Sequence, residues 1–217
     1  MAVFSSVVLA ASLALALFHF RWLERPASHP RAVLKTVPVL LLVVYAFLAG
    51  APLLLVVALA LGALGDACLA FEGETAFIAG LAAFLFSHLA YVGLFWPAVE
   101  PGLVVGSPWR YAVAWALVVL LGMMLLVLWR PAGKLVVPIA VYAIAIIAMA
   151  LSALMLRPVP PSAGAALFVM SDAALAVQKF LVKPGSPVTK RLKFFVWGTY
   201  YAAQLIFTLA FAGLPRF

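Results

Sequence analysis

The chain has 217 residues, of which 68% are apolar and only 9% are charged. A typical soluble domain is about 45–50% apolar and about 25% charged, so a water-soluble globule is excluded. Disordered chains are polar and poor in aromatic residues, whereas 13% of this chain is aromatic, which excludes disorder. The composition predicts one integral membrane domain over residues 1–217. Its length allows about eight spans of about 20 residues each.

The chain carries 14 Lys and Arg against 6 Asp and Glu, a formal charge of +8. In a soluble protein such an excess would suggest nucleic acid as a partner. Here the basic residues lie almost entirely between apolar runs, which indicates the positive-inside bias of membrane loops and no nucleic-acid partner. Cys68 is the only cysteine, so no intramolecular disulfide can form.

Eight apolar runs follow one another: 2–20, 34–49, 52–70, 76–97, 109–129, 134–155, 163–182 and 190–213. They show no alternation of apolar and polar residues, so they predict helices and not the strands of a barrel. The first run is followed by Arg21 and Arg25 and has no basic segment before it, which is typical of a membrane span and not of a cleaved signal peptide. The predicted fold is an all-α polytopic membrane bundle of about eight helices.

Alternate loops carry very different numbers of basic residues. One set of loops holds Arg21, Arg25, Arg31, Lys35, Arg130, Lys134, Lys179, Lys183, Lys190, Arg191 and Lys193, and the other holds Arg110, Arg157 and Arg216. The larger set is expected to face the cytoplasm. Both termini are then outside, and we expect the protein in a bacterial cytoplasmic membrane.

The two halves of the sequence resemble each other weakly. Lys35 precedes Pro38 at the start of one predicted helix, and Lys134 precedes Pro138 in the same way. Asp66 and Asp172 then occupy similar places one helix later. This favours a parallel internal repeat of four plus four helices, a known device of membrane proteins. Chance similarity between apolar stretches is the alternative.

Few polar residues lie inside the predicted spans, and an ionisable group there is a candidate functional residue. Asp66, Asp172 and His88 are the strongest candidates, with Tyr142, Tyr200, Tyr201 and Gln204 as polar neighbours. By depth they fit one pocket that opens toward the cytoplasmic leaflet. The structural alternatives are a solvated acidic turn for Asp66, a pairing with Tyr, Gln or His on another helix for Asp172, and a hydrogen-bonded core histidine for His88. No spacing of ligands suggests a metal, and no cofactor motif is present.

Several motifs are similar to those of the YhhN-like lysoplasmalogenase family. They are Gly65-Asp66, Phe84-x-x-Ser87-His88-x-x-Tyr91, Phe168-x-x-Ser171-Asp172-x-x-Leu175-Ala176 and Thr199-Tyr200-Tyr201-x-x-Gln204. The similarity in the order and spacing of these motifs extends over nearly the whole chain. One departure is that Thr36 and Val37 stand between Lys35 and Pro38, where the family has Lys and Pro adjacent.

The resemblance implies an enzyme that hydrolyses the vinyl-ether bond of lysoplasmalogens to a fatty aldehyde and a glycerophospho-alcohol. Protonation of the vinyl-ether carbon needs a carboxylic acid, and the cation that forms needs a carboxylate, as in glycosidases. We expect Asp172 as the acid and Asp66 as the carboxylate, although the reverse assignment stays open. His88 is expected to assist catalysis.

The remaining candidates are expected to bind the lysophospholipid substrate, which reaches the site from the membrane lipid. They are Lys35, Tyr142, Ser171, Tyr200, Tyr201 and Gln204. Lys35 is expected to contact the phosphate. The alternative function is a small proton-coupled transporter or channel, because two intramembrane aspartates and a repeat are also typical of carriers.

Overall fold

The computed structural model describes residues 2–183 and 185–212, and the ordered elements in these ranges are all helical. The helices are α1 (Ala2–His19), α2 (His29–Leu48), α3 (Leu53–Leu69), α4 (Glu74–Phe95), α5 (Gly102–Val105), α6 (Pro108–Leu128), α7 (Val136–Leu154), α8 (Val159–Phe180) and α9 (Pro187–Phe211). Short 3-10 helices follow α1 and α4 and precede α7. The predicted all-α fold is confirmed.

Each of the eight predicted apolar runs corresponds to one long helix, and the differences lie at the ends. Helix α2 begins at His29, five residues before its predicted start, because Pro30 is well suited to the first turn of a helix. Helix α8 begins four residues early, at Val159, for the same reason. The four-residue α5 was not predicted, because so short a helix has no apolar period.

Seven helices of the described chain are long and apolar enough to cross a membrane. The remaining long helix, α3, has 17 residues and falls just short of that length. Its sequence is as apolar as that of its neighbours, with Asp66 as its one ionisable carboxyl group. These helices are those of an integral membrane protein.

The described chain forms two compact units. Unit 1 comprises residues 2–91 and 204–212, and unit 2 comprises residues 92–203. Helices α4 and α9 therefore each contribute residues to both units. The single domain over residues 1–217 and the internal repeat stay predictions.

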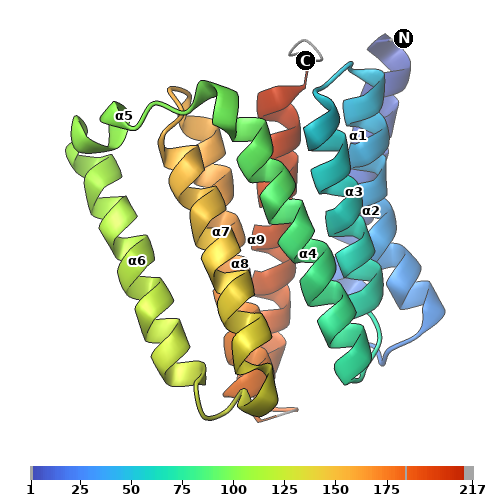
Figure 1. Cartoon of the computed structure of the whole chain (residues 1–217). Coiled ribbons are helices and arrows are strands. Elements are labelled where there is room, and N and C mark those ends of the chain that lie inside the picture. Colours follow the sequence, from blue (N-terminus) through green and yellow to red (C-terminus); the bar gives the residue numbers. More distant parts are fainter. Residues whose placement is uncertain (1, 184, 213–217) are drawn as a thin grey trace. The chain divides into compact units, whose positions relative to one another are not determined.

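In unit 1, α1 packs against α2, and α2 packs against α3 (Figure 1). Gly50 ends α2 with a positive φ of 74°, a conformation that glycine adopts without strain. The N–H of Ala51 then bonds to the carbonyl of Ala46 over 3.0 Å, and α3 starts directly after Pro52. This tight turn brings α2 and α3 together side by side.

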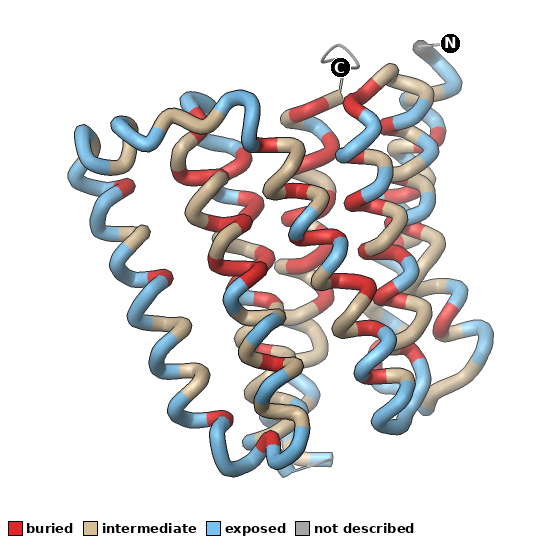
Figure 2. The backbone as a smooth tube through the Cα atoms, viewed as in Figure 1, coloured by how far each residue is buried: buried red, intermediate tan, exposed pale blue. Residues whose placement is uncertain are grey.

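In unit 2, α6 packs against α7 and α7 against α8. Most of the length of α6 is exposed (Figure 2), and its exposed residues include Trp115, Val119 and Leu126. Such an apolar surface suits contact with lipid. Arg110, counted above among the loop residues, is buried at the start of α6. Its guanidinium donates to the carbonyls of Leu154 and Leu156, the latter over 2.7 Å, and so satisfies carbonyl groups at the end of α7.

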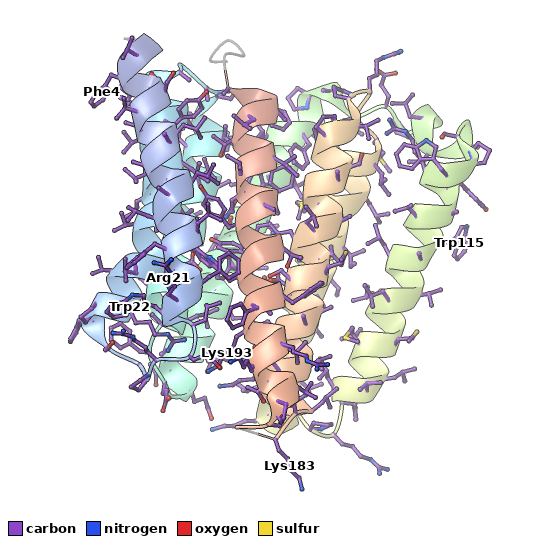
Figure 3. The ribbon with its side chains drawn as sticks, turned by 180° about the vertical axis from the view of Figure 1, so that it is seen from behind. Phe4, Arg21, Trp22, Trp115, Lys183 and Lys193 are labelled. Atoms are coloured by element: carbon purple, nitrogen blue, oxygen red, sulfur yellow. The ribbon has the colours of Figure 1, made fainter. Side chains whose placement is uncertain are left out.

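Basic and aromatic side chains mark the ends of the spans. In unit 1, Arg21 and Trp22 lie at the end of α1 opposite Phe4 (Figure 3). The guanidinium of Arg25 lies 3.9 Å from the centre of the Trp22 ring. Lys183, in unit 2, lies in the loop between α8 and α9. Arg216, counted above, lies outside the described residues.

Candidate functional site

Asp66 is buried in α3 and forms an ion pair with a lysine of the neighbouring helix α2. Its side chain is only 2% exposed, and its Oδ1 lies 3.3 Å from the Nζ of Lys35 on α2. The solvated acidic turn considered for this residue is therefore wrong, and the exposed acidic residues of that region are Glu72 and Glu74. Asp66 can be buried in the helical core because the ammonium of Lys35 compensates the negative charge of its carboxylate.

Lys35 lies in the second turn of α2, three residues before the internal Pro38. Its side chain is 19% exposed. The carbonyl of Pro38 accepts a hydrogen bond of 2.7 Å from Ser12 on α1. Lys35 therefore projects from a segment of α2 that is fixed on one side by α1 and on the other by α3.

Gly65 lets α4 approach the backbone beside Asp66. A Cβ atom at residue 65 would lie 2.5 Å from Cε2 of Phe84 on α4, which is closer than real contacts allow. Three residues after Phe84, Ser87 donates a hydrogen bond of 2.8 Å to the carbonyl of Ala58 on α3. The motif Gly65-Asp66 thus combines a close helix contact with a buried charge.

His88 and Gln204 are both fully buried in unit 1. Tyr91, one turn after His88, donates a hydrogen bond of 2.5 Å to Oε1 of Gln204 on α9. The Tyr91 ring also lies 4.5 Å from that of Phe207. Gln204 is therefore part of the contact between α4 and α9. His88 lies on α4, the same helix as Tyr91.

Asp172 has a neutral partner in unit 2. Tyr142 on α7 donates its hydroxyl hydrogen to Oδ2 of Asp172 on α8, and both residues are partly buried. The structure thus brings together two residues that sequence analysis selected separately. It also agrees with the pairing on another helix that was considered for Asp172.

Ser171, Tyr200 and Tyr201 are buried between α8 and α9. Ser171 donates a hydrogen bond of 3.0 Å to the carbonyl of Val196. The ring of Tyr200 meets Phe168 edge-on at 5.3 Å, and Tyr201 stacks on Trp197 at 5.9 Å. The contacts of Ser171 and Tyr200 fix α8 against α9 beside Asp172, whereas Tyr201 and Trp197 both belong to α9.

Two residues near Lys35, His19 and Arg31, were not selected from the sequence. His19, at the end of α1, is fully buried, and Lys35 and Arg31 are both close enough to act on it electrostatically. The spacing of Arg31 and Lys35 was the available signal, because residues four apart share one face of a helix. Arg31 was counted with the basic residues of the cytoplasmic loops and was not singled out as a site residue.

The described residues thus form three pairs of candidates or their neighbours: Lys35 with Asp66, Tyr91 with Gln204, and Tyr142 with Asp172. Asp66 and Asp172 belong to different units, so the single pocket stays a prediction. Across residues 2–183 and 185–212, no three His, Cys, Asp or Glu side chains are grouped to hold a metal ion.

Three curated relatives illustrate the similarity to known proteins. A lysoplasmalogenase of Mycobacterium bovis is 33% identical over 72% of this chain and 59% of its own length. The human lysoplasmalogenase TMEM86B is 33% identical over 82% of this chain and 74% of its own. The pig lysoplasmalogenase TMEM86B is 31% identical over 93% of this chain and 84% of its own. The chain thus spans about 59% of the length of the mycobacterial relative.

No solved structure matches the chain significantly. Residues 30–211 match the sequence profile described as the YhhN family. This range begins in the first turn of α2 and ends with α9, so it includes both carboxylate pairs. The chain belongs to the YhhN family.

Proposed function

We propose that the chain is a membrane-embedded hydrolase that cleaves the vinyl-ether bond of lysoplasmalogens. The observation that carries this proposal is the similarity to proteins named lysoplasmalogenase, which extends over 93% of the chain in one of them. The two carboxyl groups on apolar helices, each paired with a side chain of a neighbouring helix, support it. The products are a fatty aldehyde and a glycerophospho-alcohol.

The reaction needs a proton on carbon and a water molecule. A carboxylic acid protonates the β-carbon of the vinyl ether, which leaves a cation shared between the α-carbon and the ether oxygen. Water adds to the α-carbon and loses a proton to a base, giving a hemiacetal. The hemiacetal hydroxyl then loses its proton while the bond to the glycerol oxygen breaks, and that oxygen takes up a proton, which releases the aldehyde and the glycerophospho-alcohol. Acid–base catalysis by a positioned side chain contributes about 10²–10⁴-fold to such a step.

The partners of the two aspartates support different roles. Asp66 faces an ammonium group, and an ion pair requires it as a carboxylate, which suits the stabilisation of a cation or the activation of water. Asp172 accepts a hydrogen bond from the hydroxyl of Tyr142, which positions its carboxyl group. Because the ion pair assigns the carboxylate role to Asp66, we propose Asp172 as the general acid.

The other candidates have supporting roles in this proposal. His88 assists in orienting water, while Tyr142 orients the carboxyl group of Asp172. Ser171, Tyr200, Tyr201 and Gln204 are proposed to shape the substrate site from α8 and α9. The ion pair of Lys35 with Asp66 favours a role for Lys35 in holding this carboxylate.

The relatives are named as enzymes, which does not favour the transporter alternative. We propose further that the loops rich in Lys and Arg face the cytoplasm and that both termini are outside. A tag fused to the C-terminus and probed in intact cells tests this orientation. Protection of the tag by the membrane would contradict it.

Release of aldehyde by the purified protein tests the proposed function. The substrate is a lysoplasmalogen in detergent micelles, and the control is the same lysophospholipid with a saturated ether, which has no double bond to protonate. We expect aldehyde from the vinyl ether alone. Equal turnover of both lipids, or of neither by folded protein, would contradict the proposal.

A further inference from the structure

Arg31 has a buried hydrogen-bond donor that has no role in the catalytic mechanism proposed above. It lies in the first turn of α2, and its side chain is partly buried. Its Nε atom is buried and donates to no acceptor among the residues that the structure describes. A buried charged donor without an acceptor is unfavourable in a folded protein unless a ligand supplies the acceptor.

The charges around Arg31 favour an anionic ligand. Arg31 and Lys35 both act on the buried His19, so two cations lie close together at this end of unit 1. Lys35 is already paired with Asp66 at 3.3 Å. Glu72 acts on Arg31 electrostatically, but Glu72 is exposed and leaves the Nε without a hydrogen bond. Lys35 is thus engaged with a carboxylate, whereas the buried Nε of Arg31 has no acceptor among the described residues.

We infer that Arg31 binds the phosphodiester of a lysophospholipid whose ether end reaches Asp66. The identity of this lipid rests on the proposed function. A guanidinium group suits the task because its planar donors match two phosphate oxygens. Arg31 precedes Lys35 by four residues, which is about 6 Å along the helix axis. A three-carbon glycerol spans a comparable distance between its phosphate and its ether oxygen.

Arg31 and Asp66 lie at different distances from the helix ends, in the same order as the polar and apolar parts of such a lipid. Arg31 lies beside the loop before α2, where a polar head group meets water. Asp66 lies one turn inside α3, which ends at Leu69, and the helices beyond it are apolar. A lysolipid held by Arg31 therefore places its ether near the Lys35–Asp66 pair and its alkyl chain in the hydrocarbon.

Binding of two unreactive probes to the purified protein tests this inference. One probe is the saturated-ether lysophosphocholine, and the other is the same alkylglycerol without its phosphate. We expect Arg31→Gln to weaken binding of the first probe by about tenfold or more, because a charged hydrogen bond is lost. Binding of the alkylglycerol should stay within about twofold of the original, since it has no anion to lose.

Arg25→Gln is the matched control, because Arg25 is exposed, stacks on Trp22 and belongs to the loop before α2. It should change neither affinity. Arg31→Lys keeps the charge without the fork of donors and should give an intermediate loss for the phospholipid alone. Its melting temperature, with that of Arg31→Gln, shows whether each variant folds.

The inference is wrong if Arg31→Gln weakens both probes equally while Arg31→Lys weakens neither, which would indicate a structural role. It is also wrong if inorganic phosphate alone displaces the lipid probe as well as unlabelled lipid does, which would indicate a free-anion site. Neither probe is cleaved, so these results are independent of turnover. Loss of the proposed vinyl-ether hydrolysis would leave the binding result standing.

Discussion

Asp66 and Asp172 differ in the side chain that each contacts, although each lies on an apolar helix of its own unit. Asp66 in unit 1 faces the ammonium of Lys35 at 3.3 Å, whereas Asp172 in unit 2 accepts a hydrogen bond from the neutral Tyr142. The residues that directly precede the two aspartates also differ. Gly65 admits the ring of Phe84, while Ser171 bonds to the carbonyl of Val196. One carboxyl group is fixed as an ion by an ammonium and the other accepts a hydrogen bond from a tyrosine, and such distinct environments suit a division of acid and carboxylate roles.

The largest effect is expected from removing the acid. Asp172→Asn keeps the size of the side chain but has no proton to give, so aldehyde release should fall about 10²–10⁴-fold. Asp66→Asn should also reduce the rate. Thermal unfolding of each variant in detergent verifies folding. If both folded variants kept the original rate, neither carboxyl group would have the proposed role.

Removal of the cation should destabilise unit 1. Lys35→Met leaves the carboxylate of Asp66 buried without its partner, which lowers the free energy of unfolding by about 3–5 kcal/mol. The double variant Lys35→Met, Asp66→Asn should recover most of that loss. Chemical unfolding in mixed micelles measures both.

The control for this prediction is the exposed pair of unit 2, in which Arg157 bonds to Glu100 over 2.6 Å. Arg157→Met should change the stability by no more than about 1 kcal/mol, because exposed ion pairs contribute little. A similar loss in Arg157→Met and Lys35→Met would show that burial of Asp66 has no special cost.

Crowding beside Asp66 gives a smaller effect. Gly65→Ala places a Cβ atom 2.5 Å from the Phe84 ring. The resulting overpacking should cost about 1–3 kcal/mol of stability. Phe84→Leu in the same chain should relieve part of it, as measured by the melting temperatures of the single and double variants. An unchanged melting temperature in Gly65→Ala would mean that α3 and α4 do not approach as closely as the structure has them.

The smallest effect is expected beside Asp172. Ser171→Ala removes the hydrogen bond to the carbonyl of Val196 and should cost about 1 kcal/mol. Because the backbone of α8 stays in place, the rate of aldehyde release should change little. A loss of rate as large as that of Asp172→Asn would instead make Ser171 a residue of the reaction itself.

The helices were predictable because hydrocarbon forces each apolar run to satisfy its own backbone hydrogen bonds. The pairings between polar side chains of different helices were harder to predict. Asp172 and Tyr142 were both selected for their polarity. Lys35 was also selected, but as a phosphate ligand and not as the partner of Asp66. Arg31 was assigned to a loop by its charge, whereas Pro30 suits the first turn of a helix and α2 extends over Arg31. Arg110 lies within its predicted run, but its burial against the end of α7 was not predicted.

Hydrolysis of lysoplasmalogen in D₂O tests the central claim, that the enzyme protonates the vinyl-ether carbon, most directly. The aldehyde is trapped as it forms and analysed by mass spectrometry. The account predicts one solvent deuterium on the carbon next to the aldehyde group, with the Asp172→Asn variant forming almost no product. Aldehyde without deuterium at that carbon, or undiminished labelled product from the folded Asp172→Asn variant, would contradict it.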